Sequence, residues 1–360
     1  MIWGQTKGRN LVPRRGIYTE EFKASRSGDL SLESAGFFVL EGGFLMFRNF
    51  LRPQGGPKME KALRLTMLCA AVALLCFAVT LTTCFAQDRF FDSNGVRIRY
   101  VEQGNGDAIV LIHNFGNNLD RWIASGVLPN LARDYRVIAF DVRGHGKSGK
   151  PQDAKAYGRE IGLDAIRLLD HLGIQRAHIV GYSMGARLAA QLLTTHSERF
   201  ITATLGGQAG LFRWTREDAE RAEQEASEIE RECVSRSQIY RLAPPDVPKP
   251  DEEEIKRRSA ACMADPNKDR FVLAGFRRAL KDWVITPTQV AAAKVPTLAV
   301  VGSLDGSLQD FQDLKKLRPD VKLVIIDGAT HVGTRGVERR PEFIEAVRAF
   351  IAANRTALSR

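Results

Sequence analysis

Residues 177–195 read AHIVGYSMGARLAAQLLTT, and this stretch decides the fold class. The apolar, strand-like run Ala177–Gly181 leads through Gly-Tyr-Ser-Met-Gly into a helical segment at 186–195. A G-x-S-x-G turn between a strand and a helix holds its serine out above the carboxyl end of a parallel sheet. The N-terminus of the helix that follows favours developing negative charge at that point. The stretch therefore predicts Ser183 as a nucleophile.

Short apolar, β-branched runs alternate with amphipathic segments on both sides of this stretch. Such alternation is typical of a mostly parallel sheet covered by helices on both faces. We therefore expect the α/β class, with a doubly wound, mostly parallel sheet in the domain 87–360. The expected strands are 96–101, 108–113, 136–141, 177–181, 201–205, 297–302 and 322–326, and the helices include 158–172 and 184–195.

The alternation stops between about residues 211 and 286. This segment holds charged, helical stretches and a proline-rich loop, and it has no strand pattern. We expect it to form a helical cap over the strand ends, where open α/β sheets bind ligands. Cys233 and Cys262 both fall in this cap. An oxidising compartment permits a disulfide between them, and their spacing alone leaves the geometry open.

A serine nucleophile needs a base, and the base needs an orienting acid. In sites of this kind both follow the serine, the acid first and the histidine last. Of the six histidines, His331 alone comes late, just after the last predicted strand. Asp305, at the tip of the preceding strand, fits the acid that orients the imidazole and stabilises its charged form. Asp310 and Asp327 are the alternatives.

Two backbone N–H groups are expected to hold the oxyanion that forms when the serine attacks a carbonyl. One belongs to the residue after the nucleophile, Met184. The other is expected from the loop after an early strand, where the N–H of Phe115 is the candidate.

These stretches resemble the α/β-hydrolase superfamily, in its helical-cap branch of esterases, lipase-like enzymes and carbon–carbon bond hydrolases. The resemblance covers residues 89–360 and rests on the stretches 113–116, 141–148, 181–185, 302–305 and 328–331. It implies a triad of Ser183, His331 and Asp305 that cleaves a carboxylic ester through an acyl-enzyme. It also implies a structural role for 141–148, with His145 as a packing residue. Epoxide hydrolases and haloalkane dehalogenases of this fold use an aspartate nucleophile, so a serine at this position disfavours them.

One departure from the family lies in the oxyanion loop, which has His113-Asn114 where the family usually has His-Gly. Glycine tolerates backbone angles that other residues resist, and asparagine is among the better substitutes. We expect Asn114 either to keep the turn and alter the pocket with its side chain, or to weaken the oxyanion hole. Loss of one such donor costs roughly a hundredfold in rate.

The expected substrate is a small-molecule ester or a similar carbonyl compound in an apolar pocket. Its candidate lining residues, which fit core positions equally well, are Asn114, Phe115, Trp122, Tyr182, Met184, Phe212 and Trp214. No metal-ligand spacing and no phosphate-binding loop occur, so neither a metal nor a cofactor is expected. A carbon–carbon bond hydrolase or a cofactor-free perhydrolase with the same triad is the first alternative. A ligand-binding or signalling protein with little turnover is the second.

Residues 65–87 carry no charge and follow two basic residues, which is the layout of a secretory signal. Because such a signal should begin a chain, we expect translation to start at Met59. Residues 59–86 are then the signal, and residues 1–58 are a poorly ordered upstream extension.

Cleavage after Ala86 predicts an exported protein, either periplasmic or secreted. The apolar run 65–87 is also long enough to remain as a membrane anchor. A lipoprotein signal that ends at Cys84 is the third interpretation.

The charge of the chain carries little information about its partners. The sequence has 360 residues with 52 Lys and Arg against 42 Asp and Glu, and its formal net charge is +10. Residues 1–64 contain 11 basic and 6 acidic residues, so half of the excess precedes the catalytic region. No nucleic-acid-binding motif accompanies the remaining charge, so no nucleic-acid partner is expected. The sequence does not indicate an oligomeric state.

Overall fold

The computed structural model describes Lys61, residues 66–68 and residues 87–354. The expectations for residues 1–58 and, apart from these few positions, for the signal segment 59–86 lie outside the described residues. Within the described ranges, no helix is both long enough and apolar enough to cross a membrane. The fold below is that of residues 87–354.

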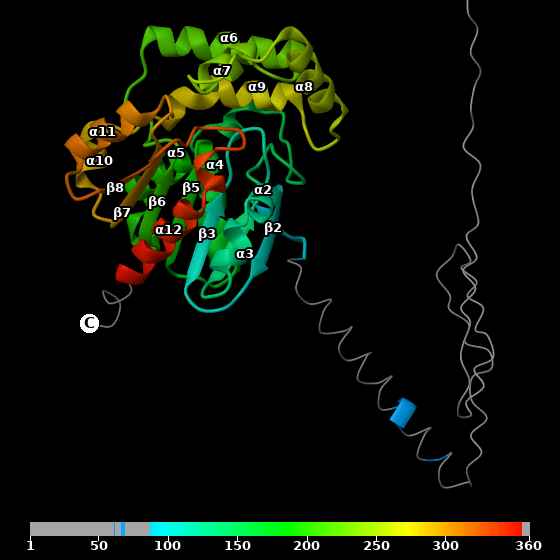
Figure 1. The fold of residues 1–360 in the computed structure, drawn as a ribbon, viewed down its shortest axis with the longest axis vertical. Helices are drawn as coiled ribbons and strands as arrows, with labels where there is room; N and C mark the ends of the chain where they lie inside the picture. The colour runs from blue at the N-terminus through cyan, green and yellow to red at the C-terminus, as the bar shows by residue number, and fades with distance from the viewer. Residues whose placement is uncertain (1–60, 62–65, 69–86, 355–360) are drawn as a thin grey trace, which may run out of the picture. The chain divides into compact units, whose positions relative to one another are not determined.

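An eight-stranded sheet forms the centre of the fold, in the order β1-β2-β4-β3-β5-β6-β7-β8 (Figure 1). The pairs β1–β2 and β2–β4 are antiparallel, and the other pairs are parallel. The predicted class, a mostly parallel α/β sheet, is therefore confirmed. The strands are β1 (Arg89–Ser93), β2 (Val96–Gln103), β3 (Ala108–Ile112), β4 (Arg136–Phe140), β5 (Ala177–Tyr182), β6 (Phe200–Gly206), β7 (Thr297–Gly302) and β8 (Lys322–Ile326).

The first strand, β1, has no counterpart among the expected strands. Asn94 and Gly95 join it to β2 in a two-residue turn, and both have positive φ, at 59° and 82°. An Asn-Gly pair is a strong signal for this type of hairpin. The local sequence therefore held the information for β1.

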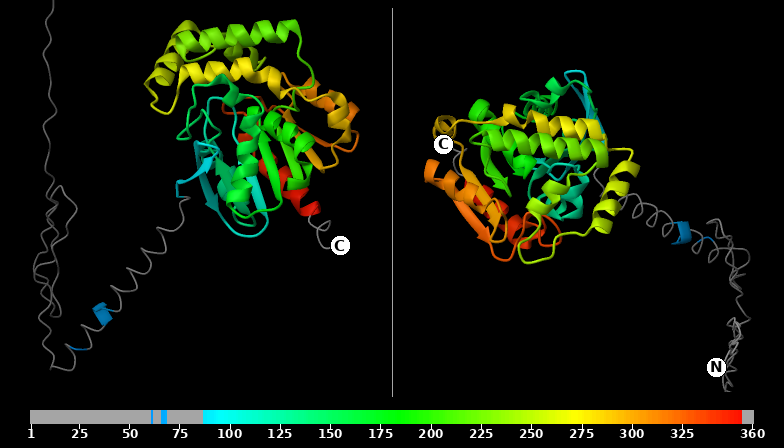
Figure 2. Two further views of the ribbon diagram at one scale, coloured as in Figure 1. Left: turned by 180° about the vertical axis from the view of Figure 1, so that it is seen from behind. Right: turned by 90° about the horizontal axis from the view of Figure 1, so that it is seen from above.

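Helices cover both faces of the sheet (Figures 1 and 2). Strands β3, β5 and β7 are buried along their whole length, as expected for strands covered on both sides. One apolar core packs under α4 (Glu160–His171), α5 (Met184–Thr195), α10 (Pro287–Ala292) and α11 (Leu308–Leu317). The other packs under α2 (Asp120–Ala124), α3 (Val127–Leu131) and α12 (Pro341–Ala353). Short 3₁₀ helices are η2 (Ala154–Tyr157), η3 (Ser197–Arg199), η4 (Leu280–Trp283) and η5 (Val337–Arg339).

The chain leaves the sheet between β6 and β7 and forms a layer of helices with no strand. These are α6 (Arg216–Glu232), α7 (Arg236–Leu242), α8 (Glu252–Ala264) and α9 (Arg270–Ala279). Helices α6 and α9 pack side by side, beyond one end of the strands of the sheet (Figures 1 and 2). Thr215 and Asp218 form a capping box that begins α6, and the carboxylates of Asp251 and Asp269 cap α8 and α9.

A disulfide joins Cys233, at the end of α6, to Cys262 in α8. Both cysteines are buried, and the bond closes the loop that contains α7 and the proline-rich segment. The structure therefore brings together the two cysteines whose pairing the sequence left open.

We expect reduction of this disulfide to lower the stability of the cap. Closing a loop of this length contributes about 2–4 kcal/mol, mainly by restricting the unfolded chain. The double variant Cys233→Ala/Cys262→Ala should therefore unfold at a lower denaturant concentration than the oxidised protein. Addition of dithiothreitol should shift the wild-type midpoint and leave that of the variant unchanged. An equal shift in both proteins would contradict a contribution from this bond.

Candidate active site

Ser183 lies on a tight turn between β5 and α5, as the G-x-S-x-G pattern predicted. Its backbone has φ of 53° and ψ of −110°, which a non-glycine residue rarely adopts. A Cβ atom at Gly181 would lie 2.2 Å from the carbonyl oxygen of Gly185, and one at Gly185 would lie 2.0 Å from that of Ile112. Both glycines are therefore required by the close approach of the backbone.

A hydrogen-bonded chain connects Ser183 to the two other predicted triad residues. Ser183 Oγ lies 2.9 Å from His331 Nε2, and His331 Nδ1 lies 2.9 Å from Asp305 Oδ2. Because a carboxylate only accepts, Nδ1 carries the proton and Nε2 is free to accept the proton of the serine. The structure thus brings Ser183, His331 and Asp305 together in the order that general-base activation of a serine needs.

The surroundings hold the acid and the histidine in place. The N–H of Ser307 donates to Asp305 Oδ1 at 2.9 Å, on the side away from the imidazole. Tyr182 donates its hydroxyl to the backbone oxygen of His331 at 2.7 Å. Burial raises the pKa of Tyr182 well above its usual value, so this hydroxyl stays protonated.

The alternative acids have other positions. Asp327 is exposed and accepts a hydrogen bond from Ser303. Asp310 lies in the first turn of α11, where burial raises the pKa of its carboxyl group and the charges of Arg187 and Arg213 oppose this shift. Only the expected acid, Asp305, contacts the base.

The two candidate oxyanion donors flank the serine. Phe115 and Met184 line the same cavity as Ser183. Among residues 87–354, neither backbone N–H has a protein acceptor, which leaves both available to a substrate oxygen. The loop that carries Phe115 is fixed by His113, whose Nε2 accepts from the N–H of Val142 at 3.0 Å and whose Nδ1 donates to the carbonyl of Asn114 at 2.8 Å.

Asn114 does not need the backbone freedom of glycine. Its φ lies outside the left-handed region, which in this loop is occupied by Gly116 at 71°. Its side-chain oxygen is buried without a hydrogen-bond partner, and the residue does not line the cavity around Ser183. Asn114 thus lies outside the lining of this cavity, and a role for its side chain in the pocket stays a prediction.

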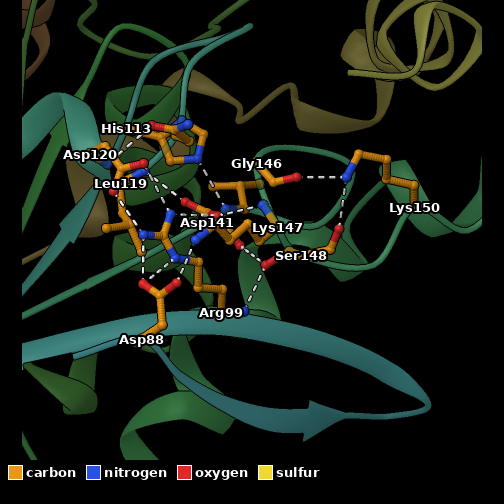
Figure 3. Close-up of polar contacts among 12 residues, drawn as sticks. Asp88, Arg99, His113, Leu119, Asp120, Asp141, Gly146, Lys147, Ser148 and Lys150 are labelled. Atoms are coloured by element: carbon orange, nitrogen blue, oxygen red, sulfur yellow. Dashed lines mark hydrogen bonds and ion pairs between the residues drawn. The ribbon is translucent and has the colours of Figure 1, made fainter. Parts of the chain in front are cut away.

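The stretch 141–148 ties the oxyanion loop to the sheet, which agrees with its expected structural role. Asp141, fully buried, accepts from the N–H of Leu119 at 2.7 Å and of Lys147 at 2.8 Å, and it pairs with Arg99 at 3.3 Å (Figure 3). His145 packs edge-on against Phe276 of the cap, with ring centres 4.6 Å apart. One carboxylate thus joins β2 to the loops that follow β3 and β4.

Three other predicted pocket residues lie elsewhere. Trp122 is the buried residue of α2 and lies in the apolar core on the opposite face of the sheet. Tyr182 is buried in the same core, where it supports His331. Phe212 packs in a separate apolar cavity beneath α10. The position of a residue in the repeat of a strand or helix decides which side of the sheet its side chain faces. The aromatic character of these residues did not reveal that side. Trp214 does line the cavity, together with Phe115 and Met184.

Several lining residues escaped the sequence reasoning because they are charged. The space between the cavity walls, its open mouth included, is about 720 Å³. Four arginines line it: Arg187, Arg221, Arg241 and Arg277. The first lies four residues after the nucleophile, one turn along the helix that begins there, and this spacing was a usable signal. Within the described ranges, no group of three or more His, Cys, Asp or Glu is placed to hold a metal ion.

The comparisons with known proteins agree with this geometry. A family profile described as the alpha/beta hydrolase fold matches residues 107–223. The 3-oxoadipate enol-lactonase 1 of Acinetobacter baylyi is 26% identical over 249 residues, which cover 69% of this chain and 89% of that enzyme. The crystal structure of a hydrolase from Pseudomonas aeruginosa superposes with a TM-score of 0.59 at 26% identity, and covers 74% of this chain and 98% of that one. These findings support the α/β-hydrolase superfamily, whose fold residues 87–354 share.

Stronger identities are confined to a shorter stretch. The 2-hydroxy-6-oxo-6-(2'-aminophenyl)hexa-2,4-dienoic acid hydrolase of Metapseudomonas resinovorans is 38% identical over 129 residues, which cover 34% of this chain and 43% of that enzyme. The chain spans between 31% and 43% of the length of those curated relatives that are 37–38% identical.

We expect the stability of the protein to fall as the pH drops below about 6.5. Burial lowers the pKa of His113 and of His145 below 6.5, the value expected when the chain unfolds. Unfolding therefore takes up protons at acidic pH, and the stabilisation is complete above 6.5 and lost below it. Urea unfolding at pH 7.5 and 5.5 measures the difference in unfolding free energy.

The variant His145→Leu isolates one of these groups. Without this imidazole, the chain takes up one proton fewer when it unfolds at acidic pH. The loss of unfolding free energy between pH 7.5 and 5.5 should therefore shrink by up to about 1.4 kcal/mol per pH unit. An unchanged loss in this variant would show that His145 titrates alike in the folded and unfolded chains.

Proposed function

We propose that the protein is a serine hydrolase that cleaves a carboxylic ester or lactone through an acyl-enzyme. The observation that carries this proposal is the continuous hydrogen-bonded chain from Ser183 Oγ through His331 to Asp305, which opens into a cavity under the cap. Such a chain supplies a nucleophile, a general base and an orienting acid.

The reaction follows from this arrangement. His331 Nε2 takes the proton of Ser183 as Oγ attacks the carbonyl carbon, and Asp305 stabilises the imidazolium that results. The N–H groups of Phe115 and Met184 donate to the oxyanion. When the tetrahedral intermediate collapses, His331 returns the proton to the alcohol that leaves. His331 then deprotonates a water molecule, which attacks the acyl-enzyme. As the second tetrahedral intermediate collapses, His331 returns this proton to Ser183 Oγ, and the acid is released.

The relatives support hydrolysis and leave room for one alternative. An enol-lactonase covers most of the chain at 26% identity, which favours a cyclic or linear ester. A hydrolase of a dienoic acid is 38% identical over 129 residues, which supports carbon–carbon bond hydrolysis on the same triad as the second candidate. A non-catalytic binding protein remains an outcome of the test below.

Export from the cytoplasm completes the proposal. The apolar segment 65–87 has the layout of a signal. The disulfide between Cys233 and Cys262 supports a location in an oxidising compartment, where such bonds persist. Whether the segment is cleaved or kept as an anchor is decided by N-terminal sequencing of the protein from its native membrane and soluble fractions.

We expect esters of graded chain length to be hydrolysed by the wild type and not by Ser183→Ala. Loss of the nucleophile should lower kcat/KM by at least about a thousandfold, because the hydroxyl and its base act as one unit. The unfolding midpoint of the variant should stay close to that of the wild type. A fluorophosphonate probe should label the wild type and not the variant.

The two readouts separate the alternatives. Labelling of Ser183 without hydrolysis of any ester would favour a carbon–carbon bond substrate, tested with a dienoic ring-cleavage product. Failure to label Ser183 in the folded protein would favour the binding protein and contradict the proposed function.

A further inference from the structure

The cavity above Ser183 is basic, although an apolar acyl pocket was expected. The four arginines that line it come from four different helices: α5, α6, α7 and α9. Asp218 is the single acidic residue among the described residues of the lining. Apolar side chains line much of the rest of the cavity, so the excess of positive charge is the feature that distinguishes it from the expected acyl pocket. A buried charge without an opposite charge is costly, which favours an anionic ligand here.

Arg187 is the least compensated of these cations. It is half-buried in the cavity wall, and its Nε and Nη2 donate to the amide oxygen of Gln208 at 3.1 and 2.8 Å. No carboxylate lies within ion-pair distance of it among residues 87–354. Burial and then the positive charge of Arg241 lower the pKa of Arg187 to about 10, which still leaves it charged at neutral pH.

The other arginines are only partly neutralised. Glu225, fully buried, pairs with both Arg277 and Arg241, so one carboxylate serves two guanidinium groups. Asp218 pairs with Arg221 at the cavity mouth. The four arginines thus face two carboxylates, an excess of two positive charges. Asp310 interacts with Arg187 electrostatically but forms no ion pair with it among residues 87–354, and burial raises the pKa of its carboxyl group.

This arrangement points to the chemistry of the substrate. A guanidinium presents paired N–H donors that match a carboxylate or phosphate, and such charge-assisted bonds are stronger than neutral ones. Hydrogen bonds to Gln208 hold Arg187 in place before a ligand arrives, which reduces the entropy lost on binding. Arg187 follows Ser183 by one helical turn, so an anion at Arg187 lies within the same small cavity as the reacting carbonyl.

We propose that the site selects esters or lactones that carry a second, anionic group, foremost a carboxylate, which binds at Arg187 while Ser183 attacks the carbonyl. This inference rests on the proposed function, since it names the substrate class of the same site. It replaces the expected apolar acyl pocket by one that discriminates through charge.

Matched pairs of p-nitrophenyl esters test the proposal. Half-esters of dicarboxylic acids, from succinate to suberate, are compared with the fatty-acid esters of equal length, in which a methyl group replaces the carboxylate. The rate with Ser183→Ala is subtracted for each ester, because a neighbouring carboxylate can assist spontaneous hydrolysis. We expect kcat/KM for the best half-ester to exceed that of its partner by at least about tenfold.

Substitutions at two arginines identify the group responsible. Arg187→Gln should lower the ratio of the two kcat/KM values by about tenfold or more. Arg187→Lys should give a ratio between those of the wild type and Arg187→Gln, because a lysine keeps the positive charge but lacks the paired N–H donors of the guanidinium. Arg216→Gln is the matched control. It removes one positive charge from the exposed side of α6, where Arg216 pairs with Glu220 outside the cavity, and should leave the ratio unchanged.

Each outcome decides between the inference and the proposed function. Ser183-dependent hydrolysis that favours the fatty-acid esters, or a ratio that Arg187→Gln leaves intact, overturns the inference and keeps the function. An equal fall in Arg216→Gln would assign the effect to the overall charge and also overturn it. If no ester is hydrolysed, the proposed function fails. In that case the melting temperature of Ser183→Ala is measured with dicarboxylates and with the corresponding diamides. A rise with the dicarboxylates alone would support an anion site at Arg187, and no difference would overturn it, because only a bound ligand raises the melting temperature.

Discussion

The close approach of three backbone segments at the end of β5 is the constraint on which the rest of the site depends. The chain must turn from strand to helix within one residue, and this places Ser183 in a rarely occupied backbone conformation. Gly181 and Gly185 make the turn possible, because a Cβ at either position would overlap a backbone carbonyl. The packing of α5 against the sheet holds this conformation, and in return the hydroxyl is presented to the cavity with little freedom to move.

Two polar supports extend this rigidity to the partners of the serine. Asp141 and His113 bind the loop after β3 to the loop after β4, so the N–H of Phe115 has a fixed position. On the other side, Tyr182 holds the backbone of His331, and Ser307 holds the acid. Tyr182 directly precedes the nucleophile in the chain. The end of β5 therefore positions Ser183 toward the cavity and, through the hydroxyl of Tyr182, also holds the backbone of His331.

The cap contributes the part of the site that differs most from expectation. Its helices are amphipathic and strongly charged, and the buried pair of Glu225 with Arg277 joins α6 to α9. The same packing turns arginines toward the cavity. In the proposed function, the sheet carries the reacting residues, and the cap carries arginines that are proposed to recognise the substrate. A fold that is shared with many relatives does not by itself determine the substrate.

The sequence by itself determined the fold class, the turn at Ser183 and the order of the triad. Each of these is encoded locally, by apolar runs, by two glycines and by the positions of Asp305 and His331 after predicted strands. It also contained signals that were not used, such as the Asn-Gly pair of the first hairpin and the arginine one turn after the nucleophile. Tertiary structure alone decided which face of the sheet Trp122 and Tyr182 occupy, whether Cys233 meets Cys262, and which charges remain unpaired. Those outcomes depend on contacts between segments far apart in the chain, and the partner of a buried arginine cannot be known before the helices that carry both are packed together.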